Sequence, residues 1–239
     1  MFNVERQFVN QLIENRCGTN TFSIVKYFKA WKDSLENDRS PVDERKPWMT
    51  FQSIDMLDRE LTSESVIFEY GSGGSTLYFL DKGAKVITVE HDKTWIDLLK
   101  HKIQDDGLNH NWIGLHKMPI DSDRISKDSN VADPDCYTSN AKKYRRFDFK
   151  PYASAIDDYQ DCLFDLVSVD GRSRPSCIKH SAKKVKIGGW LLLDNSERKY
   201  YLNQKTLIYL EGFEIILDEY CPAPGVHNFT KTTIWKRIV

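Results

Sequence analysis

The sequence predicts an α/β fold: a doubly wound, mostly parallel sheet of seven strands that ends in an antiparallel hairpin and is preceded by N-terminal helices. Two observations carry this prediction. From residue 66 onward, short apolar runs alternate with stretches of helical spacing, which is typical of βαβ units. Near the C-terminus, two apolar segments flank a stretch containing proline and glycine, which suits a closing hairpin.

The predicted strands follow the apolar runs in chain order. The parallel strands are expected at 66–70, 85–90, 112–117, 163–169 and 190–193, and the closing pair at 213–219 and 230–237. Helices are expected at 75–82, 93–104, 152–161, 175–186 and 198–210. Parallel strands in such a sheet end at one edge, and ligands bind in the crevice outside that edge. Residues that follow these strands are therefore the candidates for function.

Three stretches of helical spacing precede the first strand, at 8–13, 24–35 and 51–61. The polar segment 36–47 contains two prolines and predicts a linker. We therefore expect a helical extension over 1–62 and a main domain over 63–239. The helices either pack on one edge of the sheet or cover the ligand crevice.

The first predicted strand is followed by a glycine-rich turn: Gly71, Ser72, Gly73, Gly74, Ser75 and Thr76. Glycine permits positive φ and lets a ligand approach the backbone, and the following helix start offers free N–H groups. The turn predicts a polar or anionic ligand, although a tight strand-helix connection alone would also use glycine. The dinucleotide pattern G-x-G-x-x-G is broken, because Thr76 stands at its sixth position.

Two carboxylates flank this turn. Glu69 precedes Gly71 by two residues, where it could accept hydrogen bonds from the ammonium group of an amino-acid ligand. Glu90 ends the second predicted strand nineteen residues after Gly71, a spacing that suits an acceptor for ribose hydroxyls. His91 directly follows Glu90 and is a candidate for contact with the adenine ring of a nucleoside ligand.

These residues resemble the first motifs of the class I S-adenosylmethionine-dependent methyltransferases, with matches at Glu69, Gly71, Gly73, Gly74 and Glu90. The resemblance extends over about residues 66 to 239 and implies that S-adenosylmethionine is the cofactor. The cofactor-binding residues that it implies are Glu69, Gly71, Ser72, Gly73, Gly74, Ser75, Thr76, Glu90, His91, Asp121 and Asp170.

Asp170 follows the fourth predicted strand, and Asp194 and Asn195 follow the fifth. This trio resembles the metal-binding residues of catechol and caffeoyl-coenzyme A O-methyltransferases, which implies a catalytic role and a magnesium or other divalent cation. Alternatively, each Asp caps the helix that follows it. Two carboxylates brought together there would need a cation or Arg172 to neutralise them.

The segment after Asp170 departs from that metal-dependent pattern, since Arg172 and Arg174 would place positive charge beside a cation. The same turns resemble those of uncharacterised bacterial methyltransferases and, distantly, plant polysaccharide glucuronate O-methyltransferases. This second resemblance implies that Arg172 or Arg174 binds a substrate carboxylate.

Residues 121–150 interrupt the alternation of strands and helices. This stretch is highly charged and shows neither the helical nor the strand spacing of apolar residues. Such an insertion at the ligand end of a sheet is either a solvated loop or a mobile flap over the site.

Composition limits the remaining classes. The net charge of −1 gives no global field for nucleic acid or an anionic membrane, and no apolar run is long enough to span a bilayer. Five scattered cysteines (Cys17, Cys136, Cys162, Cys177 and Cys221) and an N-terminus without a signal-peptide pattern predict reduced thiols in a soluble, cytoplasmic protein. A small-molecule substrate is expected, and no oligomeric state is indicated.

The leading hypothesis is a methyltransferase that uses S-adenosylmethionine and acts on a small oxygen nucleophile. Two alternatives stay open. One is an NAD(P)-dependent oxidoreductase on a similar sheet, which Glu69 and the missing sixth glycine disfavour. The other is a non-catalytic S-adenosylmethionine-binding module.

Overall fold

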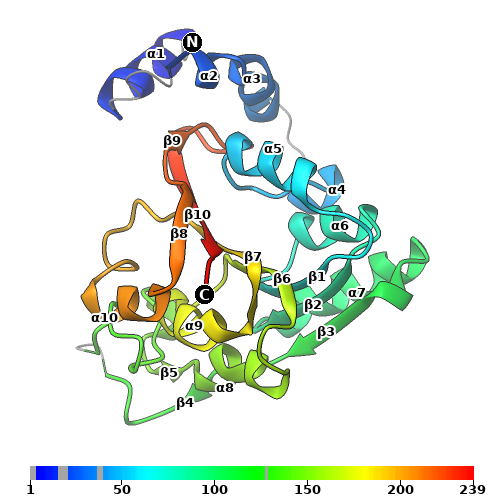
Figure 1. Cartoon of the computed structure of the whole chain (residues 1–239), viewed down its shortest axis with the longest axis vertical. Helices are drawn as coiled ribbons and strands as arrows, with labels where there is room; N and C mark the ends of the chain where they lie inside the picture. Colours follow the sequence, from blue (N-terminus) through cyan, green and yellow to red (C-terminus); the bar gives the residue numbers. More distant parts are fainter. Residues whose placement is uncertain (1–3, 16–20, 37–39, 127–128) are drawn as a thin grey trace.

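A computed structural model describes residues 4–15, 21–36, 40–126 and 129–239. Seven strands form a mixed sheet in the order β3-β2-β1-β6-β7-β10-β8, and β9 pairs with β10 (Figure 1). The sheet strands are β1 Val66–Tyr70, β2 Lys85–Glu90, β3 Trp112–His116, β6 Phe164–Val169, β7 Val185–Asp194, β8 Phe213–Leu217, β9 Tyr220–Cys221 and β10 Thr230–Arg237. The first five are parallel, whereas β10 runs antiparallel to β7 and β8. The predicted fold class is confirmed.

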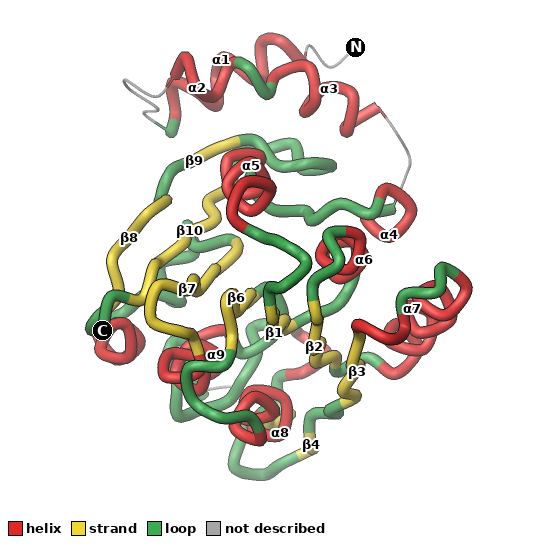
Figure 2. Tube along the Cα trace, turned by 45° about the vertical axis from the view of Figure 1, so that its right-hand side comes forward, coloured by secondary structure: helices red, strands yellow, loops and turns green. Residues whose placement is uncertain are grey.

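Helices cover both faces of this sheet (Figure 2). Side chains alternate along β1, so that Ile67 packs into one apolar cluster while Phe68 and Tyr70 pack into the other. The cluster of Ile67 includes side chains of α4 Pro41–Glu44, α5 Phe51–Glu60, α6 Gly74–Asp81 and α7 Lys93–Asp105. The other includes α8 Lys150–Ala153, the 3-10 helix Ser154–Asp158 and α9 Arg174–Ser181.

Three N-terminal helices lie beside β9 and the start of β10: α1 Val4–Glu14, α2 Thr21–Val25 and α3 Phe28–Glu36 (Figure 1). Phe8, Ile24 and Trp31 bury their side chains against Phe229 in a third apolar cluster. The Trp31 indole also donates to the Val226 carbonyl at 2.7 Å. These helices pack beside the last strands of the sheet, as one of the two alternatives expected.

The predicted linker 36–47 is instead partly ordered by packing, although its residues 37–39 lie outside the described residues, as does Cys17. Ser40 caps α4 through the Asp43 N–H, and Pro41 begins the helix. Arg45, in the left-handed region at φ 53°, forms ion pairs with Asp81 and Asp106. A polar segment with two prolines therefore forms a short helix that packs against α6.

Three predicted boundaries are wrong. The helix expected over 175–186 ends at Ser181, and β7 begins at Val185 because Gly188 at φ 84° lets the strand bend before residue 190. The helix expected over 198–210 shrinks to α10 Gln204–Leu207 and a 3-10 turn to Leu210, since Asn203 accepts from the Lys205 N–H and caps the start. Residues 198–203 are consequently turns.

The 121–150 insertion, whose residues 127–128 lie outside the described residues, carries a small antiparallel pair: β4 Ile120–Asp121 and β5 Phe147–Asp148. It also has fixed contacts to the domain. The Tyr137 hydroxyl lies 3.1 Å from His180 Nε2, and His180 Nδ1 lies 2.7 Å from Asp157. Phe149 is fully buried. The segment is thus tied to α9 and the core at its C-terminal end, in contrast to a wholly solvated loop.

Within the described residues, no helix is both long and apolar enough to cross a membrane.

Candidate functional site at the carboxyl edge of the sheet

The glycine turn lies where β1 leaves the sheet. Gly71 adopts φ 90°, and its N–H donates to the Val89 carbonyl at 3.0 Å. An added Cβ there would lie 3.1 Å from Gly171 Cα, because the chain leaving β6 crosses close to it. At Gly73 an added Cβ would have only the Trp95 ring near it, at 3.9 Å. The backbone at Gly73 is therefore open to a ligand on the side where a side chain would stand.

Glu69 is bound by the chain itself. Its carboxylate accepts from the hydroxyls of Ser75, of Thr76 at 2.6 Å and of Thr88 at 3.1 Å. Burial raises the pKa of Glu69 to about 7, against the lowering effect of these hydrogen bonds. The side chain is 1% exposed, so in this conformation Glu69 organises the glycine turn.

Glu90 is similarly buried at the end of β2. One oxygen accepts from the Ser72 N–H and hydroxyl, each at 3.1 Å, and the other accepts from the backbone N–H groups of His91 and Asp92. His91 Nδ1 lies 2.6 Å from the same carboxylate. Although burial acts to raise it, the pKa of Glu90 is lowered by His91 and these backbone donors.

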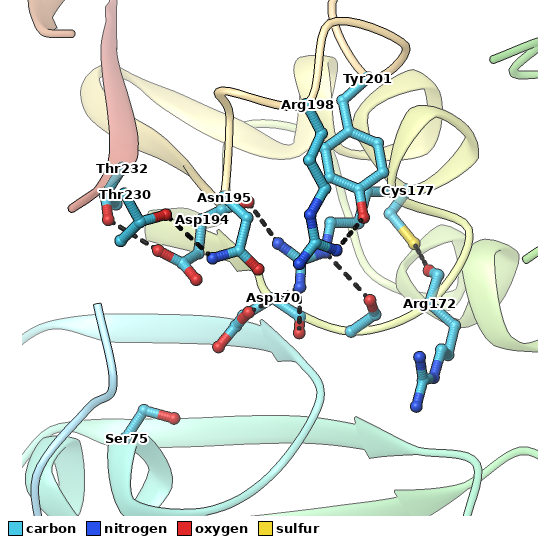
Figure 3. A network of polar contacts seen from close by, with 12 residues as sticks. Ser75, Asp170, Arg172, Cys177, Asp194, Asn195, Arg198, Tyr201, Thr230 and Thr232 are labelled. Atoms are coloured by element: carbon cyan, nitrogen blue, oxygen red, sulfur yellow. Dashed lines mark hydrogen bonds and ion pairs between the residues drawn. The ribbon is translucent and has the colours of Figure 1, made fainter. Parts of the chain in front are cut away.

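Asp170 and Asp194 come together at the neighbouring ends of β6 and β7. Arg174 at the start of α9 joins them: its guanidinium donates to the Asp170 carboxylate at 2.9 Å, to the Gly171 carbonyl at 3.1 Å and to the Asp194 carbonyl. Arg174 is only 6% exposed. One buried arginine therefore links both strand ends, where Figure 3 shows Asp170 and Asp194 next to each other.

These two carboxyl groups differ in their surroundings. Asp194 is 2% exposed, and its Oδ1 accepts from the Thr232 hydroxyl at 2.7 Å. Burial and then the charge of Asp170 raise the pKa of Asp194 to about 8. The Asp170 side chain is 34% exposed. Burial raises the pKa of Asp170, and the charge of Arg174 limits this rise. Both carboxyl groups therefore bind a proton more readily than a solvated aspartate, and the ion pair with Arg174 favours the charged form of Asp170.

The predicted metal site does not fit this arrangement. The guanidinium of Arg174 stands against Asp170 where a cation would be needed, and Asn195 uses its amide to donate to the Thr230 hydroxyl at 3.2 Å. No cluster of three His, Cys, Asp or Glu suitable for a metal occurs among the described residues. Arg172, expected as the neutralising arginine, forms no ion pair with Asp170, and its guanidinium lies 5.8 Å from the Tyr144 ring centroid instead. The neutralising residue is Arg174.

Two other predicted cofactor-binding residues, His91 and Asp121, lie in different surroundings. The His91 ring packs edge-on against Tyr144 and lies near Phe149, with centroids 5.1 and 5.7 Å away. Aromatic residues of the insertion therefore line the end of β2. Asp121, by contrast, lies on β4 with its side chain 67% exposed and 4.0 Å from Arg146. Asp121 therefore belongs to the small β4–β5 pair, and its side chain faces solvent.

A cleft of about 240 Å³ adjoins the Asp170 loop. It is lined by the loop that leads into α9, by residues 138–141 of the insertion and by the turns after β7. Arg172, Arg174 and Arg198 all line it.

Four residues at this edge of the sheet were not predicted from the sequence: Thr232, Trp95, Arg198 and Tyr201. Thr232 reaches Asp194 because β10 pairs with β7 in that register, and the Trp95 indole donates to the Ser72 carbonyl at 2.7 Å from α7. Arg198 and Tyr201 fell inside a predicted helix. The only available signal was the cap residue Asn203, which places the helix start after them.

The strand order, with five parallel strands and an antiparallel β10, forms a methyltransferase-like Rossmann α/β fold. No protein-family model and no curated protein matches the chain. Among solved structures, the chain is similar to a protein assigned as an O-methyltransferase from Klebsiella pneumoniae (TM-score 0.53, 14% identity, 91% of this chain and 96% of that one). It is also similar to a protein assigned as an rRNA methylase from Clostridium thermocellum (0.52, 14%, 79% and 94%). A third is cofactor-bound Rv0187 from MTB (0.51, 12%, 88% and 90%). At such identities the likeness shows the fold.

Proposed function

We propose that this protein transfers a methyl group from S-adenosylmethionine to an oxygen atom of a small molecule. The observation that supports this most is the convergence of the open glycine turn, Glu90 and the Asp170 loop at one edge of a methyltransferase-like sheet. The cofactor would supply an electrophilic methyl group on a sulfonium. The protein then has to align the acceptor, exclude water and remove a proton.

The residues present fit this cofactor. The backbone at Gly73 has open space on its ligand side, and Glu90 holds its carboxylate charged at the end of β2. The Ser72 hydroxyl occupies one acceptor position of Glu90 that a ribose hydroxyl would take. His91, with Tyr144 and Phe149 around it, offers an aromatic wall for the base.

Asp170 is the proposed general base. It is the more exposed member of its pair, and the ion pair with Arg174 fixes its orientation. An acceptor hydroxyl would give its proton to the Asp170 carboxylate as the new C–O bond forms. Asp194 and Asn195 position the turn, and no divalent cation is required by these contacts.

The test is calorimetry on the purified chain with S-adenosylhomocysteine, S-adenosylmethionine and NAD. We expect binding of the first two and none of NAD. Binding of NAD alone would instead support an oxidoreductase. Turnover of an extracted metabolite pool with methyl-labelled cofactor, repeated in excess chelator with the same yield, separates an enzyme from a binding module and rejects a metal.

A further inference from the structure

The cleft beside the Asp170 loop has an unusual charge composition. Three arginines line it, Arg172, Arg174 and Arg198, and no acidic residue is among its described lining residues. The insertion adds Thr138, Ser139 and Asn140, all of which have side chains able to donate a hydrogen bond. Such a lining lacks a counter-charge of its own.

The arginines are neutralised to different extents. Arg174 pairs with Asp170 at 2.9 Å, and Arg198 Nε lies 3.8 Å from the Glu197 carboxylate. Arg172 has no carboxylate within ion-pair distance among the described residues, and its guanidinium lies 5.8 Å from the Tyr144 ring centroid. The cleft therefore keeps excess positive charge.

We infer that this cleft binds an anionic group of the methyl acceptor, a phosphate or a carboxylate, through Arg172 and Arg198. Planar guanidinium groups match both oxyanions with paired hydrogen bonds. Arg174 both lines the cleft and contacts Asp170, so a single residue separates the bound anion from the proposed base. The anion serves as a handle, and a hydroxyl elsewhere on the same molecule is the group that is methylated.

This inference rests on the proposed function for its use in catalysis, but the binding step can be tested without turnover. Titration with inorganic phosphate and with acetate, at low and high ionic strength, measures the cleft directly. We expect one of the two to bind, more weakly at high salt. Arg172→Ala and Arg198→Ala should each weaken that binding about tenfold, the loss of one charge-assisted contact. Arg59→Ala, an exposed arginine of α5, is the matched control and should change nothing.

Each result has one consequence. Preference for phosphate or for acetate identifies the source of the anion. Binding that survives both arginine changes, or no anion binding by a protein that binds S-adenosylhomocysteine, overturns the inference and leaves the proposed function intact. Arginine-dependent anion binding by a protein that does not bind S-adenosylhomocysteine keeps the cleft and removes the proposed function.

Discussion

The two halves of the carboxyl edge hold their acidic residues by different means. At the ends of β1 and β2, Glu69 and Glu90 are satisfied mainly by hydroxyl and backbone donors close to the glycine turn. At the ends of β6 and β7, Asp170 and Asp194 face each other and depend on one buried arginine. The first half is a neutral-donor cradle, and the second is a charge cluster.

This difference indicates which half of the carboxyl edge tolerates the substitution of one hydrogen-bond donor. Several neutral donors share the stabilisation of each glutamate, so the loss of one leaves the others in place. In the charge cluster, removal of Arg174 would leave the Asp170 carboxylate and three carbonyl oxygens without their common donor. We therefore expect the largest effects at β6 and β7.

The largest expected effect follows from Arg174→Leu. Breaking a buried ion pair by removing one partner typically costs about 3 to 5 kcal/mol, because the remaining charge is uncompensated. Urea unfolding measures the loss. Arg172→Leu is the matched control and should cost much less, because Arg172 is half-buried and has no ion pair with Asp170 to lose. Equal losses in the two variants would show that Arg174 does not hold the cluster.

Next is a pair of glycines in the cradle. An alanine at Gly74 would press its Cβ onto the carbonyl oxygens of Pro41 and Lys46, so Gly74→Ala should lower the free energy of unfolding by about 1 to 3 kcal/mol. Gly73→Val should leave the fold intact and abolish binding of S-adenosylhomocysteine, because its side chain enters the open ligand side. Unfolding curves and calorimetry on both variants test this, and unchanged affinity in Gly73→Val would contradict the proposed cradle.

The third change is Glu90→Ala, which should weaken S-adenosylmethionine by about 1 to 3 kcal/mol, the loss of charge-assisted hydrogen bonds to a ribose. Calorimetry measures it. Ser72→Ala removes one donor to Glu90 and serves as the comparison, with little loss expected. If Glu90→Ala binds as the parent does, Glu90 only caps the turn.

The last prediction concerns the dependence of stability on pH. The pKa of Asp194 rises from its ordinary value of 3.8 to about 8 in the folded chain, so the folded state binds the proton more tightly. That contribution to stability is complete below about pH 3.8 and is lost as the pH rises through 8. Asp194→Asn should flatten the fall in melting temperature over the upper part of this range. Glu69→Gln, tested separately, accounts for the second raised pKa, of about 7. A slope that Asp194→Asn leaves unchanged would show that Asp194 is ionised.

Local patterns in the sequence determined the elements and the edge at which function lies. The predicted bounds of β1 and β2 agree with the structure, because each is a short, mostly apolar run bounded by a turn signal. The turn residues Gly71 to Thr76, the strand-end position of Glu90 and those of Asp170 and Asp194 follow from the same alternation. Where the signals were weak or long, as at 36–47 and 198–210, the bounds were wrong.

Only the tertiary structure decided which partner each acidic residue takes. From the sequence, Arg172 was expected to neutralise the two carboxylates, whereas Arg174, at the start of α9, pairs with Asp170 and Arg172 does not. Thr232 meets Asp194 across 38 residues of chain through the register of β10 on β7. Apolar periodicity fixes which face of an element is buried, whereas the partner of a polar side chain depends on the packing of segments distant in sequence.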